Sequence, residues 1–175
     1  MKNAFLSLML LCFGVTAFAQ MPEMSEEHRQ ALDQLDFMAG KWSGSGWMFV
    51  QGGKRVTFEQ TEDIQWKAGK AALAIEGKGQ SEGKVIHDAF AVITYDPQKK
   101  GYDFNSVLAS GMGGKFAAKI LAENTFEWTM EMPGRTITYV ITLNEKGQWY
   151  EKGMVKMGEG QAFQFFEMTL DRVEE

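Results

Sequence analysis

From residue 41 onward, apolar and polar residues alternate with a period of two along most of the sequence. The clearest run spans residues 56–66, and its more apolar parity contains Val56, Phe58, Gln60, Glu62, Ile64 and Trp66. A period of two places successive side chains on opposite faces of a β-strand. The run therefore predicts a strand with one face toward the protein interior and the other toward solvent.

The same alternation recurs in ten segments that short turn signals separate. We expect strands at about 41–50, 55–66, 71–79, 85–95, 102–109, 115–121, 125–132, 135–144, 149–157 and 161–171. Glycine, proline, asparagine and aspartate mark the reversals between them. Because these connections are short, neighbouring strands must pair antiparallel in an up-and-down meander.

Such a meander either closes on itself or stays open as a long, flat sandwich. An open sheet leaves two unpaired edges, whereas closure removes both. We therefore predict an all-β fold, a closed antiparallel up-and-down β-barrel of about ten strands, which is wide enough to hold one small ligand. No linker or low-complexity tract marks a second domain.

One short helix is expected before the strands, where it would cap one end of the barrel. Ser25 can accept hydrogen bonds at its N-terminus, and the acidic pair that follows suits the positive end of the helix dipole. Leu32 and Leu35 recur at helical spacing. Gly40 suits a left-handed C-terminal stop.

Residues 1–19 have the pattern of a signal peptide. Lys2 precedes an apolar run from Ala4 to Phe18, and the segment ends in the small-x-small sequence Ala17-Phe18-Ala19. The run is too short for a membrane-spanning helix. We therefore expect residues 20–175 to form a single β-barrel domain that is periplasmic or secreted.

Charge and composition narrow the classes of function. The formal net charge of −5 argues against nucleic acid or an anionic membrane surface as the main partner. The single cysteine, Cys12, lies in the predicted signal peptide, so the remainder has no thiol for a disulfide, a zinc site or a nucleophile. Two distant histidines, His28 and His87, are too few for zinc, and no G-x-S-x-G or phosphate-binding loop is present. We predict a protein with no metal and no catalytic residues.

Two segments carry a resemblance to a known class of barrels. Residues 35–46 read LDFMAGKWSGSG, a short helix followed by G-x-W-x-G-x-G. This opening looks like that of calycin-type barrels, namely lipocalins, fatty-acid-binding proteins and especially nitrobindin-like proteins. Residues 91–97, AVITYDP, followed by Gly101 and Tyr102, resemble an uncharacterised family of exported bacterial calycin-like proteins. The resemblance covers roughly residues 31–171 and implies a barrel that binds a ligand.

The nitrobindin-like resemblance also implies haem held by a histidine late in the chain. Residues 125–171 contain no histidine, so this ligand cannot be transferred by position. His87, in the fourth expected strand, is the one candidate left inside the barrel, and haem stays a minor alternative. We otherwise expect no cofactor.

Candidate ligand-binding residues lie on the expected inner faces of the strands. Glu62 shares its face with Ile64, and a buried carboxylate is costly unless it is paired. Either the interior is wet near Glu62, or a cation such as Arg135 reaches it, or a bulge turns it outward. The aromatic candidates supply large apolar surfaces. The predicted ligand-binding residues are Phe58, Gln60, Glu62, Trp66, His87, Phe104, Trp128, Tyr139 and Phe166.

Two questions stay open at this stage. Either His87 or its neighbour Asp88 faces inward, because both parities of residues 85–95 are partly apolar. The barrel can also be hollow or filled: a void of about 300 Å³ or more favours a ligand. We predict an exported binding protein for a small, mostly apolar molecule. The alternatives are a structural or interaction barrel with a filled core, and a haem protein or small-molecule enzyme that uses Glu62 and His87.

Overall fold

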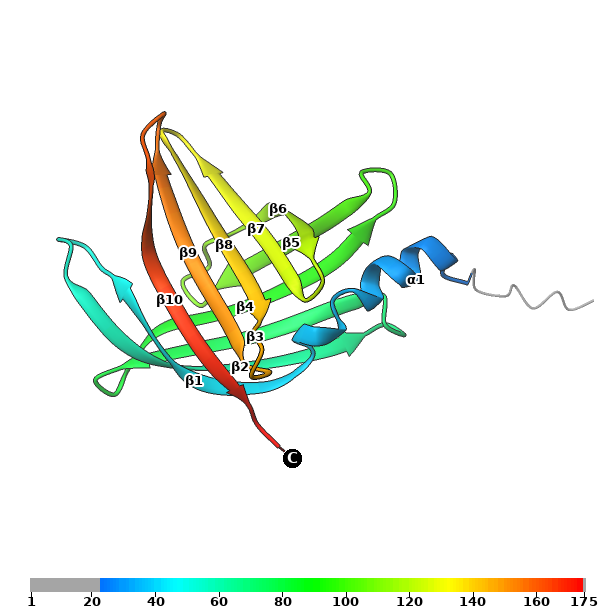
Figure 1. The fold of residues 1–175 in the computed structure, drawn as a ribbon, viewed down its shortest axis with the longest axis horizontal. Coiled ribbons are helices and arrows are strands. Elements are labelled where there is room, and N and C mark those ends of the chain that lie inside the picture. Colours follow the sequence, from blue (N-terminus) through cyan, green and yellow to red (C-terminus); the bar gives the residue numbers. More distant parts are fainter. Residues whose placement is uncertain (1–22, 175) are drawn as a thin grey trace, which may run out of the picture.

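The structure, a computed structural model, describes residues 23–174 and confirms the closed barrel (Figure 1). Each strand pairs antiparallel with its neighbours in sequence, and β1 pairs with β10. The strands lie within two residues of the expected positions. They are β1 (Gly40–Phe49), β2 (Arg55–Lys67), β3 (Ala72–Ser81), β4 (Lys84–Asp96), β5 (Gly101–Leu108), β6 (Gly113–Ala122), β7 (Thr125–Met132), β8 (Arg135–Leu143), β9 (Trp149–Met157) and β10 (Ala162–Arg172).

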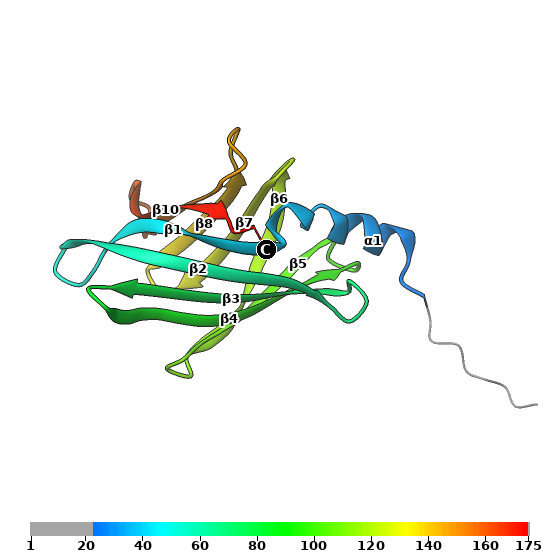
Figure 2. The same cartoon turned by 90° about the horizontal axis from the view of Figure 1, so that it is seen from below.

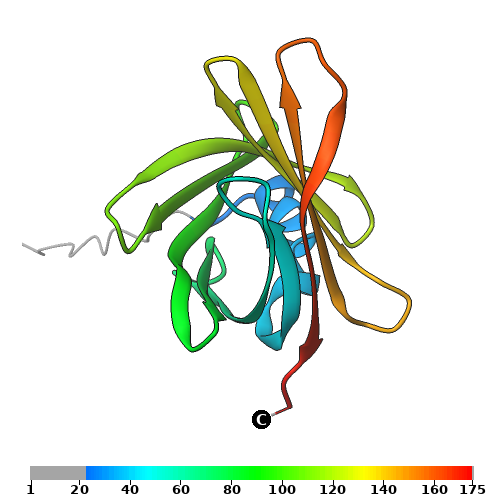
Figure 3. The ribbon, with the colours of Figure 1, turned by 90° about the vertical axis from the view of Figure 1, so that its left-hand side faces the viewer.

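The barrel has two unlike ends. Figure 2 shows β2, β3 and β4 running side by side as one wall, with the helical segment at one end. Figure 3 looks from the opposite end, where hairpins surround the barrel axis and the helix lies behind them. The expected capping helix is therefore confirmed at one end, and among residues 23–174 only hairpin loops surround the other end.

The capping segment has two parts, the α-helix α1 (Glu26–Asp33) and the 3-10 turn η1 (Asp36–Met38). Ser25 caps α1 as expected, because its Oγ accepts the backbone N–H of His28 at 3.3 Å. The prediction that Gly40 ends the helix is wrong. Gly40 is the first residue of β1, with φ +127°, and the guanidinium of Arg172 lies where a Cβ would be.

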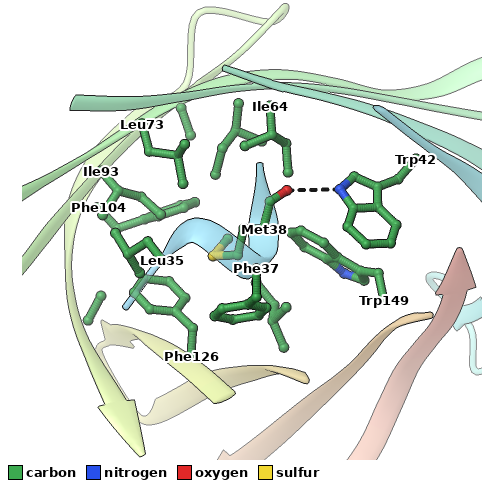
Figure 4. Close-up of a cluster of buried hydrophobic side chains, with 14 of the residues drawn as sticks. Leu35, Phe37, Met38, Trp42, Ile64, Leu73, Ile93, Phe104, Phe126 and Trp149 are labelled. Atoms are coloured by element: carbon green, nitrogen blue, oxygen red, sulfur yellow. Dashed lines mark hydrogen bonds between the residues drawn. The ribbon is translucent and has the colours of Figure 1, made fainter. Parts of the chain in front are cut away.

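Hydrophobic side chains of the capping segment fill the barrel end beneath it (Figure 4). Leu35 and Met38 are fully buried there. Three hydrogen bonds to backbone carbonyls fix the segment in place: Trp42 Nε1 donates to Met38 at 2.8 Å, Tyr102 Oη to Ala31 at 2.6 Å and Arg172 Nη1 to Ala39 at 2.6 Å. This half of the barrel is therefore a packed core.

Two glycines form the seam at which β1 meets β10. Gly44 faces Leu170 across the strand pair, and Gly46 faces Met168. A Cβ on Gly44 would lie 2.8 Å from the Cα of Leu170 and closer still to the carbonyl oxygen of Thr169. The absence of a side chain is therefore what lets the two strands approach here.

Within residues 23–174, no helix has the length and apolar character that crossing a bilayer requires.

Candidate functional site

A cavity of about 590 Å³ occupies the half of the barrel opposite the capping segment. Eight strands, β2 to β9, contribute to its wall, together with Met112 of the β5–β6 hairpin. The lining is mainly apolar and aromatic, with a few polar groups. The residues that the argument uses are Glu62, His87, Phe104, Trp128, Tyr139 and Glu151.

The aromatic wall of the cavity is a stack of three rings. Trp128 lies between Phe104 and Tyr139, with ring centroids 4.7 Å and 4.4 Å apart and planes inclined by 17° and 10°. Register produces the stack, since Trp128 is paired directly with Tyr139 and both point inward. Stacked aromatic faces are a good surface for a flat or apolar ligand.

Glu62 points into the barrel and is only 8% exposed. Its Oε1 accepts a hydrogen bond from Gln60 Nε2 at 2.7 Å. Two of the earlier interpretations are wrong. The pairing of β2 with both neighbours is regular at this position, so no bulge turns Glu62 outward. Arg135 is exposed and donates to Met132 Sδ, so it does not neutralise the carboxyl group.

Glu151 is a second buried carboxyl group in the same cavity, and sequence reasoning missed it. It is 7% exposed, and its Oε2 accepts a hydrogen bond from Trp149 Nε1 at 3.1 Å. It shares the inner parity of β9 with Trp149 and Gly153. The alternation in β9 could have revealed Glu151. Trp149 is an apolar residue that marks the inner face two positions before Glu151, just as Ile64 marks the inner face beside Glu62.

Burial changes the acidity of both carboxyl groups. Desolvation raises the pKa of Glu62 from 4.5 to about 7, and the hydrogen bond from Gln60 opposes this shift. Desolvation likewise raises the pKa of Glu151 from 4.5 to about 8, with a further increase from the nearby charge of Glu62. Near neutral pH both groups therefore hold protons that exposed glutamates would have lost.

Small residues on the inner face make room for these polar side chains. A Cβ on Gly77 would lie 2.7 Å from Glu62 Oε2, and one on Gly79 would lie 2.5 Å from Gln60 Oε1. Any larger residue at either position would force the polar side chains to move. The glycines of β3 therefore help to position the Gln60–Glu62 pair in the wall.

His87 lies at the mouth of the cavity, and the open question about β4 is resolved. His87 pairs with Gly79, and the buried residues Ala91 and Ile93 continue its parity, so this face points inward. The residue itself is exposed to solvent. The surrounding strands nevertheless desolvate the ring and lower its pKa, while the charge of Asp88 opposes that change.

The groups present fit haem poorly. His87 is the one histidine that lines the cavity, and it lies at the exposed mouth. The deep polar groups are the carboxyls of Glu62 and Glu151, which are hard oxygen ligands. Among residues 23–174 there is also no group of three or more histidine, aspartate or glutamate side chains arranged to hold a metal ion.

The other predicted residues lie around the cavity or away from it. Gln60 is buried on the inner face of β2 and donates a hydrogen bond to Glu62, but it does not itself line the cavity. Phe58 and Phe166 stack on each other at a centroid distance of 5.6 Å, next to Tyr139. Trp66 lies at the capped end, where its Nε1 donates to Asp36 Oδ1 at 2.9 Å. The structure thus brings Glu62, His87, Phe104, Trp128 and Tyr139 together, and it places Trp66 apart from them.

A second hollow, of about 650 Å³, lies along the outside of β1 to β5. Many of its side chains are outward-facing charged groups, such as Lys41, Asp63, Lys78 and Asp88. Exposed charges of this kind are solvated and form weak, salt-screened contacts. We therefore locate the candidate site in the smaller interior cavity, which combines aromatic faces with buried polar groups.

Comparison with known proteins supports the barrel fold. Neither a protein-family model nor a curated protein matches the sequence. Similar solved structures include Rv2717c from M. tuberculosis, with a TM-score of 0.61, 14% identity and coverage of 82% of this chain and 98% of that one. They also include the S-type phycobiliprotein lyase CPES from Guillardia theta, with a TM-score of 0.59, 13% identity and coverage of 85% of this chain and 96% of that one. At these identities the similarity shows a calycin-like fold.

Proposed function

We propose that this protein binds a small, mostly apolar molecule inside its barrel and has no catalytic role. The observation that carries the proposal is the interior cavity of about 590 Å³. It exceeds the void of about 300 Å³ that marks the lower end of small-molecule sites. A barrel whose interior is filled by side chains would not leave this space, so the structural alternative is disfavoured.

The distribution of side chains suggests how the ligand lies. Its apolar part would contact the stack of Phe104, Trp128 and Tyr139, where displacement of water from aromatic faces is favourable. Its polar end would lie near Glu62 and Glu151, deeper in the barrel. The mouth near His87 would be the route of entry. The similarity to a phycobiliprotein lyase and to Rv2717c supports the barrel fold that the proposal needs.

We also propose that the protein is exported and acts in the periplasm or outside the cell. The predicted signal peptide, residues 1–19, lies outside the described residues, so the proposal depends on the sequence pattern alone. Fractionation of cells that express the full chain or a form lacking residues 2–19 is the test. Export predicts a shorter mature protein beginning near Gln20 outside the cytoplasm, and only with the full chain.

The proposed binding function is tested directly by native purification. Extraction of the purified protein and mass spectrometry are expected to reveal a bound small molecule. Titration with apolar compounds is expected to change tryptophan fluorescence, because Trp128 lines the cavity. A protein that carries nothing and does not respond to any apolar class would contradict the proposal.

Filling the cavity is expected to abolish binding without unfolding the barrel. Ser106 points inward from β5 and lines the cavity, so the variant Ser106→Phe places a ring in the ligand's space. Asn105, next to it, is exposed on the outer face, and Asn105→Phe is the matched control. We expect loss of the fluorescence response in the first variant and retention in the second, with similar circular dichroism spectra. Equal binding by both variants would exclude the interior as the site.

A further inference from the structure

Among the described residues, the cavity has acidic groups but no cation to neutralise them. Its lining includes Glu62 and Glu151 at depth and Glu131 at the mouth, with no lysine or arginine. Each deep carboxyl accepts one hydrogen bond from the protein, at Glu62 Oε1 and at Glu151 Oε2. No other residue between 23 and 174 donates to the remaining oxygen of either group. The site therefore has two free acceptors in one apolar cavity.

The donors already in place favour ionised carboxylates. Gln60 Nε2 and Trp149 Nε1 donate to the carboxyl groups, and both hydrogen bonds act to lower the carboxyl pKa. Carboxyl groups that served as permanent neutral donors would be better matched by acceptors at these positions. What the ionised pair lacks is a positive charge, since two buried carboxylates in one cavity are unfavourable without one.

Tyr139 provides a second, independent observation. Its ring lines the cavity and stacks on Trp128, and no hydrogen bond from its hydroxyl to another residue in 23–174 is present. Burial, with a smaller contribution from the charge of Glu151, raises the pKa of this hydroxyl. The cavity therefore has a further polar group near the Glu151 carboxyl, and it adds an unused acceptor. The adjacent aromatic faces also attract cations.

We propose that the ligand is an amphiphilic amine, an apolar molecule whose protonated ammonium group binds between Glu62 and Glu151. This inference rests on the proposed binding function and specifies the class of ligand. The ammonium group donates up to three hydrogen bonds, which match the free carboxyl oxygens and the Tyr139 hydroxyl. The alkyl or aryl part of the ligand lies along the stack of Trp128, Tyr139 and Phe104.

Binding of an ammonium group is expected to ionise the carboxyl pair and release protons. The remaining titratable groups that face the cavity are His87, Glu131 and Tyr139; His87 and Glu131 lie at the exposed mouth, away from the pair. Affinity for an amine should therefore rise between pH 6 and pH 8.5, while the ammonium group, with a pKa of about 10, stays charged. A neutral ligand that accepts hydrogen bonds from protonated carboxyls would show the opposite trend.

The experiment compares dodecylamine with dodecanol by isothermal titration calorimetry at pH 6 and pH 8.5. We expect dodecylamine to bind about 30-fold or more tightly than dodecanol at pH 8.5. Dodecanol has no ammonium group to pair with the buried carboxylates, and loss of one partner of a buried charge pair weakens binding by at least this factor. The double variant E62Q/E151Q keeps the shape of the site and is expected to bind both compounds equally. Glu59→Gln, on the exposed outer face of β2, is the control and should behave as the native protein does.

The outcomes separate this inference from the proposed function. Dodecanol binding as tight as dodecylamine, with Ser106→Phe abolishing both, would keep the binding function and overturn the amine. Tighter amine binding that E62Q/E151Q does not weaken would also overturn it, because the ammonium group would then lie elsewhere. Failure of both compounds to bind would overturn the inference, and an empty native extract would overturn the binding function with it.

Discussion

At pH 8.5 the variant Glu151→Gln is expected to be more stable than the native protein, by an amount on the order of a few kcal/mol. The carboxyl group of Glu151 is buried and its pKa is raised from 4.5 to about 8. In the unfolded chain the same group loses its proton near pH 4.5. Between these values the folded state binds more protons than the unfolded state, so native stability falls as pH rises.

The loss of stability begins above pH 4.5 and is complete above about pH 8. A glutamine cannot ionise, and its side-chain oxygen can still accept the hydrogen bond from Trp149. Urea denaturation at pH 5 and pH 8.5 measures the difference, and the variant should show the weaker dependence on pH. Glu62→Gln should also weaken the dependence of stability on pH, between pH 4.5 and about pH 7. Glu59→Gln, on the outer face, should retain the native slope, and identical slopes in all four proteins would contradict the burial of these charges.

The variant Gly44→Val is expected to destabilise the barrel by about 3 kcal/mol or more, at the upper end of what overpacking causes. A Cβ at this position would overlap backbone atoms of Thr169 and Leu170 in β10. Backbone cannot rotate away as a flexible side chain can, so the β1–β10 seam must open. Urea denaturation monitored by tryptophan fluorescence gives the change in the free energy of unfolding.

The matched control for this prediction is Ser45→Val, the next residue along β1. Ser45 is exposed on the outer face, where a β-branched side chain suits a strand, and stability should change by no more than about 0.5 kcal/mol. If Gly44→Val does not fold, Gly44→Ala provides a smaller overlap and should give an intermediate loss. Equal stability of the Gly44 and Ser45 variants would show that the seam tolerates a side chain.

The fold could be predicted because its signals are local. Alternation in each strand and the glycine-rich turns between strands specify pairing of neighbours, and closure follows from the cost of two open edges. The predicted end of the helix was wrong because a long-range contact determines the role of Gly40. Gly40 lies beside the guanidinium of Arg172, at the far end of the sequence, and no local pattern reveals that contact.

The candidate site could be predicted only in part. Glu62 stands out because the strand around it alternates clearly, whereas the face that Glu151 occupies is interrupted by Gly153. That Glu62 and Glu151 share one cavity depends on the registers of β1, β9 and β10, which bring β2 and β9 together. The direction of His87 also could not be predicted without the strand register. Its strand alternates weakly, and the pairing with Gly79 shows that it points inward.

The seam between β1 and β10 also determines when this protein can fold. Trp42 lies opposite Arg172, so the pairing joins the first strand of the barrel to its tenth. During synthesis β1 therefore has one edge without its partner until β10 has left the ribosome. Contacts between residues this distant in sequence slow folding, and an unpaired strand edge is prone to aggregation. The barrel can consequently close only after β10 has been made, and any cellular factor that assists folding would act best by shielding the edge of β1.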